Sequence, residues 1–296
     1  MVLVVAVLIN VAFITLLERK ILGYSQVRKG PNKVRVLGIL QPFNDAIKLF
    51  SKERVLPEFS NKILYILRPG LAITFSLVVF LSFPLRELNF SFSLSILLIY
   101  IILRINVYPT LVSGWRSNRK YAIIGALRAV AQTISYEVRL ALIFLFFLTL
   151  SKCLSWNFLT FENSFFLKIF ILLPLIGIWL ISCLAETNRT PFDFAEGESE
   201  LVSGFNIEYG SVGFALIFIA EYARIFFMSS FFCYFFIFSR ANFLSSYIFI
   251  TALVFFWVWV RTTFPRYRFD LLINLAWKFY LPVVLFRFLY SCSLVL

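Results

Sequence analysis

Acidic residues are scarce in this chain and concentrated in one stretch. Five of the fifteen lie between positions 186 and 200, and the set is Glu186, Asp193, Glu196, Glu198 and Glu200, with Arg189 as the only cation among them. Packed like charges repel, so we expect at least one of these carboxylates to hold a proton near neutral pH. Coupled carboxylates can pass protons. The same stretch could instead be a solvated acidic loop that docks on a basic partner surface.

Three positions, one of them Glu186 again, place carboxylates in or beside apolar segments. Glu137 opens one such segment, Glu186 closes another, and Glu221 lies well inside a third. A charged carboxylate at membrane depth costs several kcal/mol, so such groups face a protein interior or a water-filled cavity and usually serve function. Glu208 precedes Glu221 by about 20 Å of helix. We therefore favour a proton path through these carboxylates.

The alternative is a set of buried ion pairs. Arg224 follows Glu221 by three residues and would share its helix face. Arg128 or Arg139 could serve Glu137 in the same way. Arg104, which lies inside another apolar segment, has no role that the sequence indicates; a lipid headgroup or a neighbouring subunit could contact it.

Metal and cofactor chemistry has few candidate residues in this chain. There is no His, and the four Cys are scattered singly, at positions 153, 183, 233 and 292. Zinc, haem and iron–sulfur sites need clustered Cys or His ligands. No glycine-rich phosphate loop and no catalytic triad is present. We expect no bound metal and no redox centre in this chain.

The composition indicates that these carboxylates lie in a membrane. Hydrophobic residues make up 61% of 296, mean hydropathy is +0.89 and only 15% of residues are charged. A soluble domain carries about 25% charged residues. The net charge of +13 is distributed between apolar segments and not along one surface, so we expect no nucleic-acid partner. The expected fold class is all-α and polytopic, with short interfacial helices.

A bilayer core accommodates about 20 apolar residues as a helix. On that measure the chain is one membrane domain over 1–296 with eight transmembrane helices, near 2–18, 63–83, 91–113, 134–151, 166–185, 212–238, 244–262 and 273–294. Basic residues are concentrated in the loops 18–62 and 114–133, with two more in 263–272. Positive loops stay on the cytoplasmic or matrix side, so these loops and 186–211 are predicted to face the matrix.

One segment of the first loop is predicted to be a short helix. It begins at Gln41-Pro42, where the missing N–H of proline costs nothing. Phe43, Ile47 and Phe50 fall on one face. A helix of this kind suits the membrane interface, and an ordinary amphipathic packing helix fits equally well.

Four long motifs resemble the subunit 1 family of respiratory complex I, the proton-translocating NADH:ubiquinone oxidoreductase. They run from Glu18 to Asn32 with its continuation Leu40–Glu53, from Gly114 to Val138, from Ala185 to Tyr222, and from Trp259 to Asp270 with Trp277-Lys278. They occur in the family's order over nearly the whole chain. Three positions depart from the family's pattern: Arg35 stands for a small residue, Asn44 for Ala and Phe269 for Tyr.

The resemblance implies a subunit that forms much of the ubiquinone chamber and carries no redox centre of its own. FMN and iron–sulfur clusters would reside on partner subunits. The implied partners are hydrophilic quinone-site and iron–sulfur subunits, small membrane subunits, lipids and ubiquinone. The implied location is the mitochondrial inner membrane, or alternatively a bacterial plasma membrane.

By motif position the resemblance also assigns roles to individual residues. The chamber or its entrance would be lined by Glu18, Arg19, Asp45, Ala46, Arg266 and Arg268. The proton path would use Glu137, Glu186, Glu208 and Glu221. The mobile acidic loop beneath the quinone site would comprise Arg189, Asp193, Glu196, Glu198 and Glu200.

Three other functions are compatible with parts of this pattern. A membrane anchor of a related hydrogenase-type complex would have a nickel-bearing partner, but the acidic and terminal motifs fit the quinone enzyme better. A stand-alone ion antiporter would transport ions as the purified chain. A purely structural anchor would tolerate neutral replacements of its membrane carboxylates.

Overall fold

The structure is a computed structural model that describes residues 2–53, 61–82, 95–151, 165–194, 197, 204–206, 209–237 and 243–295. Within these ranges every regular element is helical. The helices are α1 (Val2–Ser25), α2 (Gln41–Ser51), α3 (Lys62–Leu81), α4 (Ser95–Ile105), α5 (Val107–Arg116), α6 (Lys120–Ser151), α7 (Phe165–Glu186), α9 (Ser211–Phe232), α10 (Phe243–Thr263), α11 (Phe269–Asn274) and α12 (Leu281–Val295). Shorter 3₁₀ and π segments connect some of them.

Seven helical segments of this described part are long and apolar enough to cross a membrane. One of them combines α4 and α5, another combines α11 and α12, and Leu173–Glu186 of α7 is a shorter apolar segment. The predicted all-α, polytopic architecture is therefore confirmed. The side of the membrane that each loop faces stays a prediction.

Several helix boundaries differ from those predicted. Helix α1 continues past position 18 to Ser25, and α6 begins at Lys120, so much of the predicted loop 114–133 is helical. The prediction used hydropathy over about one bilayer thickness, whereas an α-helix continues wherever residues have high helix propensity, such as the alanines in 122–131. The third predicted span is divided at Asn106 into α4 and α5.

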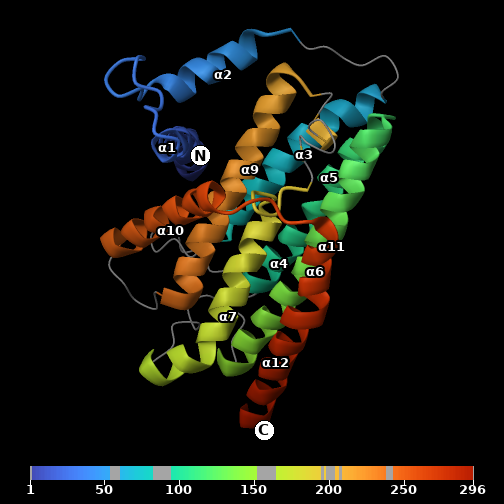
Figure 1. Ribbon diagram of the computed structural model, residues 1–296. Coiled ribbons are helices and arrows are strands. Elements are labelled where there is room, and N and C mark those ends of the chain that lie inside the picture. Colours follow the sequence, from blue (N-terminus) through green and yellow to red (C-terminus); the bar gives the residue numbers. More distant parts are fainter. Residues whose placement is uncertain are drawn as a thin grey trace.

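Helix α6 lies at the centre of the packing. It contacts α5, α7 and α12, while α3 packs on α9 and α1 packs on α9 and α10. In Figure 1 these long helices form one bundle, and the C-terminal end of α12 lies at the opposite end of the bundle from α2. The bundle brings α1, α6, α7 and α9 together, and these are the helices that carry the predicted carboxylates.

Aromatic side chains fill the interior between α6, α7 and α9. Trp179 is fully buried and stacks on Phe231 and Phe235, with ring centroids 5.4 and 5.7 Å away. Phe144 meets the same cluster at 5.4 Å from Trp179. Offset and edge-to-face aromatic pairs of this kind contribute about 0.5–1.5 kcal/mol each beyond the burial of their area. Part of the chain's large Phe content thus builds a rigid core next to the carboxylates.

Helices α5 and α6 approach each other closely at Gly114. A Cβ atom placed there would lie 2.2 Å from the Ala126 Cβ and 2.8 Å from the Ala122 carbonyl oxygen. Small residues allow membrane helices to pack at short distance. The motif that begins at Gly114 therefore has a packing function in addition to its position in the family pattern.

We expect Gly114→Leu to separate α5 from α6, because a side chain there collides with the backbone of α6. The amount of folded protein in the membrane should fall by roughly tenfold, since overpacking costs about 1–3 kcal/mol. Native gel electrophoresis of solubilised membranes measures this directly. Gly70→Leu is the matched control, because a Cβ there meets nothing within 4 Å. Equal loss in both variants would contradict the close approach at Gly114.

Helix α2 confirms the short helix predicted to begin at Gln41-Pro42. No residue of α2 is buried, and Phe43, Ile47 and Phe50 are exposed. The Phe43 ring meets the Phe13 ring of α1 edge-on at 6.4 Å. The location of this helix in the membrane interface stays a prediction.

One departure from the family pattern lies in the segment that leads into α2, and its backbone conformation does not favour the residue found there. Arg35 has a backbone φ of 55°, and Leu37 and Gly38 follow with φ of 58° and 74°. Positive φ is sterically costly for residues with a Cβ. A small residue at position 35 would suit this conformation better than the arginine that stands there.

Candidate functional site

Arg189 connects two of the predicted carboxylates. It lies in the turn after α7, and its side chain is largely buried. Its Nη1 is 3.9 Å from Glu18 Oε1, and its Nη2 is 3.7 Å from Glu221 Oε2. Its guanidinium also lies over the Tyr222 ring, 4.7 Å from the centroid. One cation thus joins the end of the apolar part of α1 to the interior of α9.

Glu18 is buried among groups that stabilise its charge. It forms an ion pair with Arg261 of α10, and the Tyr222 hydroxyl donates a hydrogen bond to its Oε2. A small pocket beside it is lined by Ile14, Leu184, Thr187, Ile225 and Trp257, among others. Its neighbour Arg19 lies on the outer side of α1, so consecutive residues of the motif have different environments.

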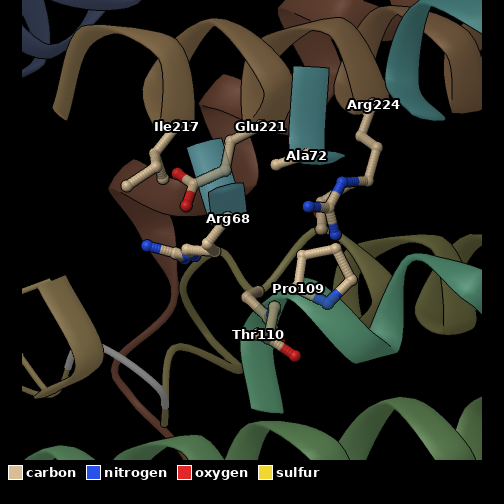
Figure 2. Close-up of a pocket in the computed structure, with 9 residues that line it drawn as sticks. Arg68, Ala72, Pro109, Thr110, Ile217, Glu221 and Arg224 are labelled. Atoms are coloured by element: carbon tan, nitrogen blue, oxygen red, sulfur yellow. The ribbon is translucent and has the colours of Figure 1, made fainter. Parts of the chain in front are cut away.

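Glu221 lines a second pocket, between α3, α5 and α9. Figure 2 shows its carboxylate on the side of Arg68, with the Arg224 guanidinium across the pocket beside Pro109. Arg189, Arg224 and Arg68 all interact electrostatically with this carboxylate. An ion pair with Arg224 was predicted. The structure gives Glu221 an ion pair with Arg189 and electrostatic interactions with Arg224 and Arg68, and the two arginines far away in sequence were missed.

Glu186 and Glu137 extend the series. Glu186 is the last residue of α7 and is buried, as is Glu137 in α6. The two carboxylates interact electrostatically with each other, and Glu186 also interacts with Arg224. One oxygen of each, Glu137 Oε1 and Glu186 Oε2, is buried and makes no hydrogen bond. Such atoms usually bind a proton donor or a water molecule.

The sequence suggested Arg128 or Arg139 as the ion-pair partner of Glu137, but the structure shows a different arginine. Arg104 of α4 lies 3.8 Å from Glu137 Oε2. Arg139 instead lies over the Tyr136 ring at 3.7 Å, because on α6 it is rotated away from Glu137 by two residues. Arg128 lies over the Phe269 ring at 6.0 Å, so the residue that departs from the family's Tyr keeps an aromatic contact.

Two predicted residues from distant motifs meet outside this series. Arg266 Nη2 lies 3.1 Å from Asp193 Oδ2, and the Tyr267 N–H donates to the Pro191 carbonyl at 3.0 Å. These contacts attach the segment between α10 and α11 to the segment after α7. The chamber residue Arg266 and the loop residue Asp193 are therefore brought together.

The remaining predicted chamber residues lie at the periphery of this chain. Arg19 and Asp45 form an ion pair between α1 and α2, and Ala46 is partly exposed beside them. Arg268 is 81% exposed and lies 4.0 Å from Asp270. The structure does not bring these four residues to the buried carboxylates. Glu196, Glu198, Glu200 and Glu208 lie outside the described residues.

Sequence reasoning did not find Arg261, Tyr222 and Arg68, and it noted Arg104 without assigning it a partner. Arg261 and Tyr222 stand within the quoted motifs but received no role. Their partner Glu18 is 243 and 204 positions away. The available signal was weak: Arg68 and Arg104 are cations within apolar segments, where a charge needs a partner.

The fold and this site define a polytopic membrane protein whose interior holds several carboxylates and arginines. Comparison with known proteins agrees with that class. The profile of a family described as NADH dehydrogenase matches residues 1–292. The chain is similar to "NADH-ubiquinone oxidoreductase chain 1" of Aedes aegypti, with 53% identity over 96% of this chain and 90% of that protein. The proteins of the same name from Locusta migratoria and Zaedyus pichiy are 52% and 46% identical, over 96% of this chain and 90% and 91% of theirs. The chain therefore belongs to the NADH dehydrogenase family.

Proposed function

We propose that this chain is a membrane subunit of NADH:ubiquinone oxidoreductase that forms the quinone chamber and links quinone reduction to proton translocation. Relatives at about 50% identity bear the name of chain 1 of that enzyme, which supports the enzyme assignment. The chain holds no redox centre in this proposal; electrons arrive from FMN and iron–sulfur clusters on hydrophilic partner subunits. Its location is the mitochondrial inner membrane.

The observation that carries the proposal is the position of Arg189 between Glu18 and Glu221. Glu18 lies where the motif resemblance places the chamber, and Glu221 begins the buried series. A change of charge at Glu18 changes the field at Arg189, which contacts both carboxylates. Charges in a low-dielectric interior interact strongly over such distances. Quinone reduction consumes protons, so it can alter the protonation of the series through this cation.

The series itself can carry a proton because neighbouring members interact electrostatically, directly or through an arginine between them. Arg224 interacts with both Glu221 and Glu186, and Glu186 interacts with Glu137. Two neighbouring carboxylates in one interior do not readily ionise together. When one carboxylate takes up a proton and becomes neutral, its neighbour therefore loses a proton more readily. The path from Glu18 to Glu137 spans α1, α9, α7 and α6, and Glu208 extends it in this proposal.

The basic residues after α10 form the outer part of the chamber in this proposal. Arg266 is fixed by Asp193, whereas Arg268 is mostly exposed and available to a ligand. A guanidinium can donate charge-assisted hydrogen bonds to a quinone carbonyl or a lipid phosphate. Arg19, Asp45 and Ala46 form the opposite border of the entrance. Asp193 with Glu196, Glu198 and Glu200 contacts the hydrophilic partner, and lipids and small membrane subunits cover the outer helices.

Arg268→Ala tests the chamber part of the proposal. We expect the apparent quinone KM to rise by roughly three- to tenfold, as one exposed charge-assisted hydrogen bond is lost. NADH oxidation by a soluble acceptor, which bypasses the quinone, should be unchanged. The control is Arg287→Ala on α12, a basic residue with no assigned role. Equal loss of both activities in the Arg268 variant would indicate an assembly role and reject the entrance assignment.

A further inference from the structure

Arg104 is a cation at membrane depth for which the proposed function gives no role. It is the penultimate residue of α4, and α5 continues the same membrane segment to Arg116. Arg104 precedes Arg116 by twelve positions, about 18 Å of helix, which places Arg104 near the middle of the segment. Its side chain is 56% exposed on the outside of the bundle. A charge at that depth is costly unless it is paired.

The pairing group is Glu137. Arg104 Nε lies 3.8 Å from Glu137 Oε2, and the guanidinium lies over the Tyr100 ring at 5.1 Å from the centroid. The two side chains of the ion pair differ in exposure. The Arg104 side chain extends from the surface of the bundle, and the Glu137 side chain is buried. The Tyr100 ring supports the guanidinium from the same helix through a cation–π contact.

The charged and titratable groups around Glu137 come from two neighbouring helices. Arg104 and Tyr100 approach from α4, and Glu186 approaches from α7. Arg104 is the cation among these groups, and Glu186 is a second carboxylate. Glu137 therefore faces one group of opposite charge, Arg104, and one of like charge, Glu186.

We propose that Arg104 is a positioning residue for Glu137, which holds this carboxylate toward α4 and makes its charged form accessible during turnover. The inference rests on the proposed function, because it assigns a role within the same carboxylate series. Without Arg104, Glu137 would be a buried carboxylate beside a second one, and it would retain its proton. The transfer of a proton beyond Glu186 would then stall at this end of the series.

A double-variant comparison in the assembled enzyme tests this role. The variants are Arg104→Gln, Arg104→Lys, Glu137→Gln and the combination Arg104→Gln/Glu137→Gln. Quinone reduction is measured per assembled complex in native membranes. We expect Arg104→Gln to slow quinone reduction by about fivefold or more, consistent with a modest loss of electrostatic stabilisation. Arg104→Lys should restore at least half of the rate, because it keeps the charge.

The combined variant Arg104→Gln/Glu137→Gln shows whether Arg104 acts through Glu137. If Arg104 acts through Glu137, the combined variant is no slower than Glu137→Gln alone, because interacting residues are not additive. Arg287→Gln, another arginine in a membrane segment, should leave the rate unchanged. A normal rate in Arg104→Gln, a fully additive loss in the combination, or failure of both Arg104 variants to assemble would each overturn the inference. If Glu137→Gln itself is fully active, the proton role proposed for Glu137 falls and the inference falls with it.

Discussion

Replacing Arg189 by Met is expected to leave little assembled complex. Arg189 contacts Glu18 and Glu221, and both carboxylates are in the interior. Removing one partner of a buried ion pair leaves an uncompensated charge and typically costs about 3–5 kcal/mol. Arg261 still serves Glu18, so we expect about 3 kcal/mol and a loss of assembled complex of at least tenfold on native gels.

Two companion variants identify the cause of that loss. Arg189→Lys keeps one cation and should retain substantially more complex than Arg189→Met. Arg189→Met combined with Glu221→Gln should also recover complex, because Glu221 then carries no charge that has lost its ion-pair partner Arg189. If the combined variant assembles no better than Arg189→Met alone, the bridge to Glu221 is not what makes Arg189 necessary.

Glu221→Gln is expected to assemble normally and to reduce quinone at least tenfold more slowly. Gln keeps the size of Glu and its ability to accept hydrogen bonds in the pocket, but it cannot give up a proton. Loss of a positioned proton-transfer group commonly costs 10²–10⁴-fold. A purely structural carboxylate would tolerate the neutral Gln, and the assembled complex would turn over at a normal rate. Quinone reduction per assembled complex separates the two cases.

Glu53→Gln is the matched control for this experiment. Glu53 is exposed just beyond α2, and the series does not include it. Its replacement should change neither assembly nor turnover. If Glu221→Gln turns over at the control rate, Glu221 does not carry protons. Poor assembly with normal specific activity would make it an ion-pair partner of Arg189, Arg224 and Arg68.

The membrane architecture was predictable because it depends on composition along the chain. An apolar run of sufficient length needs no knowledge of its neighbours to be recognised. Helix ends were predicted less well. Lys120 begins α6 in a region predicted to be a loop, and Ser25 ends α1 beyond its charged residues. Polar residues can continue a helix out of the membrane, and hydropathy does not register them.

The candidate site was predictable in its acidic members but not in their partners. Glu137, Glu186 and Glu221 stand out because carboxylates are rare in apolar segments, and Glu18 was found by its position in the family motif. Which arginine approaches each one depends on helix packing between segments that are up to 243 positions apart. The two partners proposed for Glu137 from local spacing were wrong, because Arg104 reaches it from another helix. The spacing of residues along one helix could predict only the interaction of Glu221 with Arg224, three residues later.

The central claim is that protons pass along the buried carboxylates, and Glu186 tests it most directly. It lies between Glu221 and Glu137 in the series and is fully buried. The measurement is the NADH-driven membrane potential of vesicles carrying Glu186→Gln, compared with the unaltered enzyme at equal content of assembled complex. The account predicts that quinone reduction and the membrane potential both fall severalfold while the complex stays assembled. Normal quinone reduction together with a normal membrane potential would contradict it.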